Sequence, residues 1–351
     1  MLFTPVLGTF RASLYELIDL MVFCEELGYD GVWVTEHHGG TDGGRPSPIT
    51  TLAYAAGRTE RIRLGTAAVS LPLHHPLDIA EDLATLDVLS NGRVDAGFGR
   101  GLYPALNSFF NVTPAESRGR FNESLAFIID AWTEPTAQLD GAFWTIPEIN
   151  VLPKPVQKPK PAVWITALSQ EAIDTCIAFG TNGLVGPFFS RIEDLKESHF
   201  DPWHQKVAAA GIAPGTLQLG HSEVVYVAET DEQAIEESRD HLAYHIHENM
   251  GRWLPDEDDA KGGPYAHYGV WKTMLTSALE DDALFRERTL IGSPDSIIAK
   301  LRFLEACGLT HFLPVSTWGT LPPEQVKRSL ALFAEEVMPA FRPTEVAADG
   351  K

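Results

Sequence analysis

The residues most suited to chemistry are Glu36, His37 and His38, which stand together after the apolar run 31–34. Such a run is typical of a buried strand. Imidazole titrates near neutral pH and can move a proton where the chain meets a ligand. A carboxylate and two imidazoles at the end of a strand therefore predict a proton-handling site.

A second set of residues suits a bound anion. Arg100 lies within the glycine-rich stretch 97–101, where the backbone can approach a ligand closely and a guanidinium can bind phosphate. Arg118 opens the next predicted helix, and Ser169 precedes another, whose first N–H groups are free to bind an anion. The simpler alternatives are an ion pair for Arg100 and a plain helix cap for Ser169. Together on one rim, these residues predict a phosphate-bearing ligand.

Two further groups of histidines raise the question of a metal. His74 and His75 precede a predicted helix, and His241, His245 and His247 share another. A zinc site needs at least three protein ligands, and neither group has a matching set of carboxylates. We therefore expect no metal site, and we expect the pair 74–75 to mark a helix start or an interface.

Strand-like and helix-like segments alternate along the chain and would position these residues. About eight strand–helix units predict parallel strands with crossover helices, and 351 residues suit a closed (β/α)8 TIM barrel as a single domain, 1–351. The alternative is an open doubly wound sheet, but no Gly-x-Gly-x-x-Gly motif follows the first strand. The predicted strands are 2–8, 31–35, 62–69, 94–98, 162–167, 183–186, 224–228 and 311–315, and the predicted helices are 14–27, 48–57, 76–89, 118–132, 170–179, 192–210, 231–249, 294–306 and 323–338.

Two segments fall outside this alternation. Residues 137–150 suggest a hairpin beside the barrel. Residues 250–288 are rich in Asp, Gly and Pro with interleaved aromatics, which favours an insertion that forms a lid over the site, the alternative being a solvated surface loop.

Charge and cysteine content exclude several classes of partner. A formal net charge of −21 argues against nucleic acid as a partner, because its binding needs a basic face, and against anionic membranes. Cys24, Cys176 and Cys307 are too few and too scattered for a disulfide framework. The N-terminus has neither a basic region nor a long apolar segment, so we expect no signal peptide, no membrane span and a cytoplasmic location.

In this order, the motifs resemble those of the bacterial luciferase family of flavin-dependent monooxygenases. The likeness is carried by residues 27–38, 64–76, 80–82, 89–103, 291–294 and 336–339, so it spans nearly the whole chain. It implies a (β/α)8 barrel that uses FMN, and it implies roles for eight residues around the flavin. They are His37 as general base, Ala67 and Ala68 at a non-proline cis peptide under the ring, Leu102 and Tyr103 beside the pyrimidine end, and Arg100, Arg118 and Ser169 as phosphate ligands.

The resemblance extends to the loop and to a dimer. It leaves His38 as a residue that shapes the loop and Glu36 as one that anchors it. His75 and Glu81 match residues that pair across the family's dimer interface, which implies a homodimer.

Two positions depart from the family. Gly99 stands where bacterial luciferase carries a reactive cysteine, which puts light emission in doubt. Ala172 replaces a hydroxyl residue that helps to bind phosphate, so a modest affinity is expected. That affinity suits reduced FMN delivered by a separate flavin reductase.

The resemblance therefore implies a two-component monooxygenase that uses reduced FMN and O2, through flavin C4a-peroxide chemistry, on a small organic substrate. An aromatic-lined pocket would suit an aldehyde or an aromatic compound, by hydroxylation or Baeyer–Villiger insertion. The alternatives are a deazaflavin-dependent dehydrogenase of the same superfamily and a non-catalytic flavin-binding protein. The aromatics expected in the pocket are Phe188, Trp253, Trp271 and Trp318.

Overall fold

The computed structural model describes residues 1–8, 13–39, 47–101, 107–186, 190–250, 276–277, 279 and 281–342. The strands of the barrel wall, in order, are β1 (Leu2–Phe3) and β2 (Val6–Leu7), which share the first position, then β3 (Gly31–Val34), β4 (Arg63–Thr66), β6 (Val94–Gly99), β9 (Ala162–Thr166), β10 (Asn182–Val185), β11 (Leu219–Val227) and β13 (His311–Val315). Every neighbouring pair is parallel, and β13 pairs with both β11 and β2, which closes the wall. The predicted (β/α)8 barrel is confirmed.

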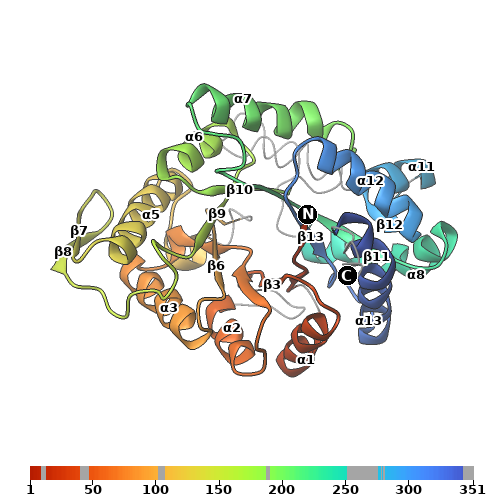
Figure 1. Ribbon diagram of the computed structural model, residues 1–351, viewed down its shortest axis with the longest axis horizontal. Helices are drawn as coiled ribbons and strands as arrows, with labels where there is room; N and C mark the ends of the chain where they lie inside the picture. Colours follow the sequence, from red (N-terminus) through yellow and green to blue (C-terminus); the bar gives the residue numbers. More distant parts are fainter. Residues whose placement is uncertain are drawn as a thin grey trace, which may run out of the picture.

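Helices form an outer ring around the strands (Figure 1). They are α1 (Leu14–Glu26), α2 (Pro48–Ala56), α3 (Pro76–Leu89), α5 (Ser117–Thr133), α6 (Gln170–Phe179), α7 (Asp201–Ala209), α8 (Asp231–Tyr244), α11 (Asp282–Arg288), α12 (Pro294–Ala306) and α13 (Pro323–Leu332). Serine side chains cap several of them, as Ser13, Ser47 and Ser293 accept the backbone N–H three residues on. Among the described residues, no helix has the length and apolar character needed to cross a bilayer.

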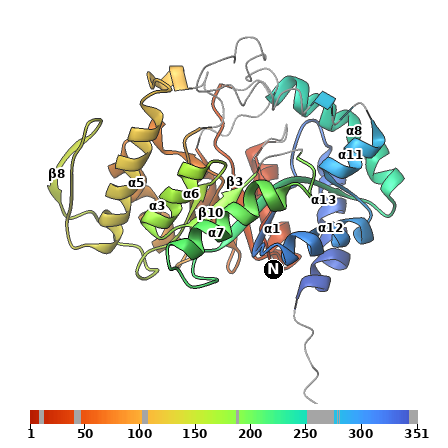
Figure 2. The same cartoon turned by 90° about the horizontal axis from the view of Figure 1, so that it is seen from above.

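The predicted hairpin is present as β7 (Ala137–Asp140) and β8 (Thr145–Ile149), which pair in antiparallel fashion. The carboxylate of Glu123 on α5 accepts the backbone N–H groups of residues 142, 143 and 144 and so fixes the hairpin turn. Figures 1 and 2 place this hairpin outside α5, on the opposite side of the barrel from α8 and α11.

The predicted insertion 250–288 is only partly described. Its last residues form α11, which begins at the cap Asp281 and buries Phe285 completely. A strand that the sequence analysis missed, β12 (Leu290–Gly292), follows and pairs with the second half of β11. The end of the predicted lid therefore belongs to the helices around the barrel. Residues 251–275, 278 and 280 lie outside the described residues.

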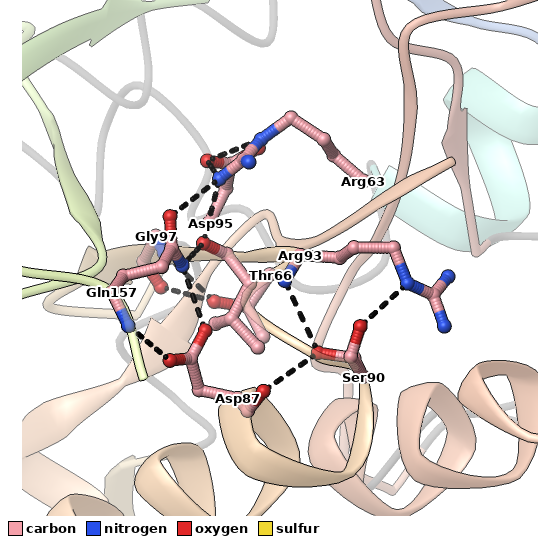
Figure 3. Close-up of polar contacts among 9 residues, drawn as sticks. Arg63, Thr66, Asp87, Ser90, Arg93, Asp95, Gly97 and Gln157 are labelled. Atoms are coloured by element: carbon pink, nitrogen blue, oxygen red, sulfur yellow. Dashed lines mark hydrogen bonds and ion pairs between the residues drawn. The ribbon is translucent and has the colours of Figure 1, made fainter. Parts of the chain in front are cut away.

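At the amino ends of the strands, an ionic network joins three neighbouring elements (Figure 3). Arg63 of β4 binds Asp95 of β6 through both carboxylate oxygens, with Nη2 to Oδ1 at 2.6 Å. Gln157 donates to Asp87 on α3 at 2.7 Å. Burial raises the pKa of Asp95, and the bond with Arg63 opposes that rise. Hydrogen bonds and an ion pair thus occupy the polar groups at this end of the barrel, opposite the carboxyl ends of the strands, where barrel active sites form.

Large aromatic side chains fill the barrel interior. Trp33 of β3 and Trp164 of β9 meet edge to face, with ring centroids 5.6 Å apart, and both are nearly inaccessible to solvent. Gly65 makes room for the first of them, because a Cβ at that position would stand 2.4 Å from the indole of Trp33. The interior is therefore a packed core and supports the site from below.

Candidate active site

The loops after the barrel strands bring the predicted residues to one end of the barrel. His37 follows β3, Ala67 and Ala68 follow β4, Arg100 follows β6 and Ser169 follows β9. In a parallel barrel these loops all lie at the carboxyl ends of the strands, where barrel active sites form. The structure thus gathers on one face residues that are far apart in the chain.

Glu36 is the buried centre of part of this face. Its side chain is 0% exposed, and its Oε1 contacts Nε2 of His38 at 2.7 Å and Nε2 of His74 at 2.6 Å. Its Oε2 accepts the Ser70 N–H at 2.6 Å. Burial alone would raise the pKa of Glu36, but hydrogen bonds from His38, His74 and the Ser70 N–H lower the pKa to about 2. Glu36 is therefore a carboxylate at neutral pH, and its predicted anchoring of the loop is confirmed.

His37, the predicted general base, is half-buried in the same loop. Close to it lies His245, at the start of the π-helical segment His245–Met250 that continues α8. Burial, and to a smaller extent the charge of His37, lower the pKa of His245 to about 3. His245 is therefore a neutral imidazole within electrostatic range of His37, a feature that the histidine spacing on the predicted helix did not reveal.

The adjacent histidines, His74 and His75, serve different purposes. His75 caps α3, since its Nδ1 accepts the Leu77 N–H at 3.3 Å, and its ring packs edge to face on Trp144. The predicted helix start is confirmed for His75. His74 instead binds Glu36, a contact that the sequence analysis missed because the two residues are 38 positions apart.

Ala67 and Ala68 are joined by the cis peptide bond that the resemblance implies. Thr66, the last residue of β4, accepts the Gly97 N–H at 2.9 Å through Oγ1 and donates to the Gly97 carbonyl at 2.8 Å. Beyond the alanines, β5 (Val69–Ser70) pairs with the end of β6. Strand β6 therefore holds the segment on both sides of the cis bond.

Arg100 and Arg118 lie within electrostatic range of the carboxylate of Glu171, in the first turn of α6, and Ser169 stands just before that helix. The pKa of Glu171 is lowered by its own backbone N–H, by the Ser169 hydroxyl, and by the positive charges of Arg118 and Arg100. Ser169 also caps α6, accepting the Ala172 N–H at 3.3 Å. Two arginines and a helix N-terminus thus lie in one region of the barrel mouth, and their role as phosphate ligands stays a prediction.

The predicted aromatic pocket gains no support from its one described member. Trp318 is 0% exposed and belongs to the hydrophobic core, so it lines no accessible surface, contrary to the prediction. The remaining predicted residues of the pocket and of the pyrimidine end lie outside the described residues: Leu102, Tyr103, Phe188, Trp253 and Trp271.

Comparison with known proteins gives one family for nearly all of this chain. The family described as luciferase-like monooxygenase matches residues 4–311. The oxygenase component of the flavin-dependent trigonelline monooxygenase from Acinetobacter baylyi is 28% identical over 94% of this chain and 91% of its own length. The 4-hydroxyprotoasukamycin monooxygenase of Streptomyces nodosus is 31% identical over 94% of this chain and 87% of its own length.

The chain is also similar to a solved monooxygenase structure and to a relative whose name gives F420 as its cofactor. The monooxygenase RslO1 from Streptomyces bottropensis superposes with a TM-score of 0.78 at 26% identity, over 97% of this chain and all of RslO1. The F420-dependent glucose-6-phosphate dehydrogenase of Kineococcus radiotolerans is 25% identical over 93% of each chain.

Proposed function

The chain belongs to the luciferase-like monooxygenase family, and from that premise we propose that it is the oxygenase of a two-component system. It would use reduced FMN and O2 to oxidise a small organic substrate. The position of Arg100, Arg118 and Ser169 near the first turn of α6 carries the proposal, because a phosphate of FMN would meet their charges and the same helix N-terminus.

The residues of the chain bind and orient the flavin. FMN, when bound in its reduced form, supplies the electrons with which O2 is activated for oxygen transfer. Arg100 and Arg118 bind its phosphate as charged hydrogen-bond donors, and Ser169 adds a hydroxyl. The segment Ala67–Ala68 supports the ring, a role that its fixation by β6 suits.

His37 handles the proton in this proposal. It stands half-buried at the mouth of the barrel, so its imidazole can take a proton from the substrate or the flavin edge and return it. The neutral His245 nearby adds no competing positive charge. Partial burial of His37 also restricts water around the proton that it transfers.

A separate flavin reductase, a homodimer and a cytoplasmic location complete the proposal. The trigonelline relative is itself described as an oxygenase component, which supports a reductase partner here. Ala172, which lacks a hydroxyl at the phosphate end, suits an oxygenase that receives its flavin by diffusion.

The second candidate function is hydride transfer with deazaflavin F420. The F420-dependent relative supports it, since that protein matches most of this chain. The Glu36-His37-His38 sequence favours the FMN branch of the superfamily.

A coupled assay tests the proposal. The protein, a flavin reductase, NADH and FMN are combined under 18O2, with panels of aldehydes and aromatic compounds as substrates. We expect a product that carries one 18O atom and that forms only when the protein is present. Absence of reduced-FMN binding together with absence of an 18O-labelled product would end the proposal.

A further inference from the structure

Four residues around Glu36 form one hydrogen-bonded unit, here called the hub: Glu36, His38, Ser70 and His74. They come from the loop after β3, from β5 beyond the cis peptide, and from the turn before α3. A single carboxylate thus connects three consecutive segments of the barrel mouth. Neither the sequence motifs nor the proposed function assigns a role to His74.

The distances in the hub indicate hydrogen bonds and disfavour a metal ion. Two imidazoles and a carboxylate within reach of one another are a possible ligand set. However, Oε1 of Glu36 lies only 2.6 and 2.7 Å from the two Nε2 atoms. Ligands on a tetrahedral zinc with bonds of about 2.0–2.1 Å stand about 3.3 Å apart. An ionised carboxylate only accepts, so His38 and His74 each carry a proton on Nε2.

Burial makes the hub sensitive to the loss of any donor. The Glu36 side chain is fully buried, whereas His38 and His74 are 15% and 27% exposed. A buried carboxylate is stable only while donors surround it, and removing one leaves an undercompensated charge. The ring of His38 also packs against Phe110, with centroids 4.7 Å apart, which extends the hub to the segment beyond β6.

The hub holds the loop on both sides of His37. Residues 36 and 38 both bond within the hub, so the backbone of His37 is fixed between two anchored neighbours. Ser70 is in register with Gly99, the residue before Arg100, so the hub also ties the His37 loop to the phosphate rim.

We propose that Glu36 and His74 are positioning residues for the reaction, acting through the hub on His37 and on the segment after Ala68. The hydrogen bonds of the hub are observed in the structure. Its effect on turnover rests on the proposed function. His74 would then affect the reaction through Glu36, although no sequence motif joins His74 to His37.

The test compares His74→Ala with His74→Gln, whose side-chain amide can still donate to Glu36. Glu25→Gln is the matched control, because Glu25 accepts three backbone N–H groups, from residues 60, 61 and 62, before β4 at the other end of the barrel. Three readouts are taken: imidazole 15N spectra of the flavin-free protein, the urea midpoint, and the affinity for reduced FMN alongside its rate of reoxidation by O2.

We expect His74→Ala to lower the reoxidation rate about 10- to 100-fold while reduced-FMN affinity changes little. His74→Gln should restore most of the rate, and Glu25→Gln should keep the wild-type rate despite lost stability. Wild-type spectra should show His38 and His74 protonated on Nε2.

Two results would overturn the proposal. In the first, the rate falls in step with the urea midpoint in all three variants, which makes the hub purely structural. In the second, Zn²⁺ binds with one-to-one stoichiometry in wild type and not in His74→Ala, which makes the cluster a metal site. Should wild type bind no reduced FMN, the proposed function fails, and the 15N spectra still decide whether the hub exists.

Discussion

Replacing Thr66 by Val tests how the segment under the predicted flavin is held. The two side chains have nearly the same shape, so the change removes a hydroxyl and leaves the packing. That hydroxyl accepts the Gly97 N–H at 2.9 Å and donates to the Gly97 carbonyl at 2.8 Å in a site that is 0% exposed. Each buried backbone group left without a partner costs about 1–3 kcal/mol, so Thr66→Val should lose about 2–6 kcal/mol of unfolding free energy.

Thr66→Ser is the matched control, because it keeps the hydroxyl and removes one buried methyl group, at about 1 kcal/mol. Both variants are unfolded in urea at neutral pH, with circular dichroism and tryptophan fluorescence followed together so that intermediates are detected. Equal stability of Thr66→Val and wild type would refute the reasoning, as would a Thr66→Ser variant destabilised as much as Thr66→Val.

The remaining predictions concern charge, cofactor affinity and the proton. Glu36 has a folded pKa of about 2, below its unfolded value of about 4.3, so its ionisation contributes about 3 kcal/mol to the free energy of unfolding. This contribution is fully present above about pH 5 and is lost as the pH falls toward 2. The difference in stability between wild type and Glu36→Gln, measured from urea midpoints, should therefore shrink over that pH range, and a constant difference would contradict the assigned pKa. Arg118→Ala should weaken FMN binding about 10- to 100-fold, measured by flavin fluorescence, whereas unchanged affinity would exclude it from the phosphate site. Glu171→Gln should tighten FMN binding, most at low salt, because it removes a competing anion; weaker binding would show that Glu171 supports the site. His37→Ala should lower turnover about 10²- to 10⁴-fold with little change in flavin affinity, and equal loss of both would remove His37 from catalysis.

Sequence alone located the regular elements well where local signals are strong. The predicted bounds of α3, α6 and α12 coincide with those observed, because Pro76 and Pro294 open two of these helices and Ser169 and Ser293 cap two of them. The alternation of strands and helices also sufficed for the closed barrel. Weak local signals failed: α11 has only seven residues and β12 only three, and β12 depends on pairing with β11 while α11 packs against β12.

The sequence identified most residues of the candidate site, but it did not show which of them contact one another. His37 and Glu36 stood out as a motif, and the cis bond at Ala67–Ala68 came from the resemblance alone. The bond between Glu36 and His74 depends on how β3 and the turn before α3 meet in the folded barrel, which no local pattern encodes. The burial that makes His245 neutral likewise arises only from packing.

An anaerobic titration can show whether the barrel mouth binds FMN through its phosphate. The protein is titrated in parallel with reduced FMN, reduced riboflavin and reduced F420, and binding is followed by absorbance. We expect FMN to bind, riboflavin, which lacks the phosphate, to bind at least about 10-fold more weakly, and F420 to fail to displace FMN. Equal affinity for FMN and riboflavin, or tighter binding of F420, would contradict this expectation.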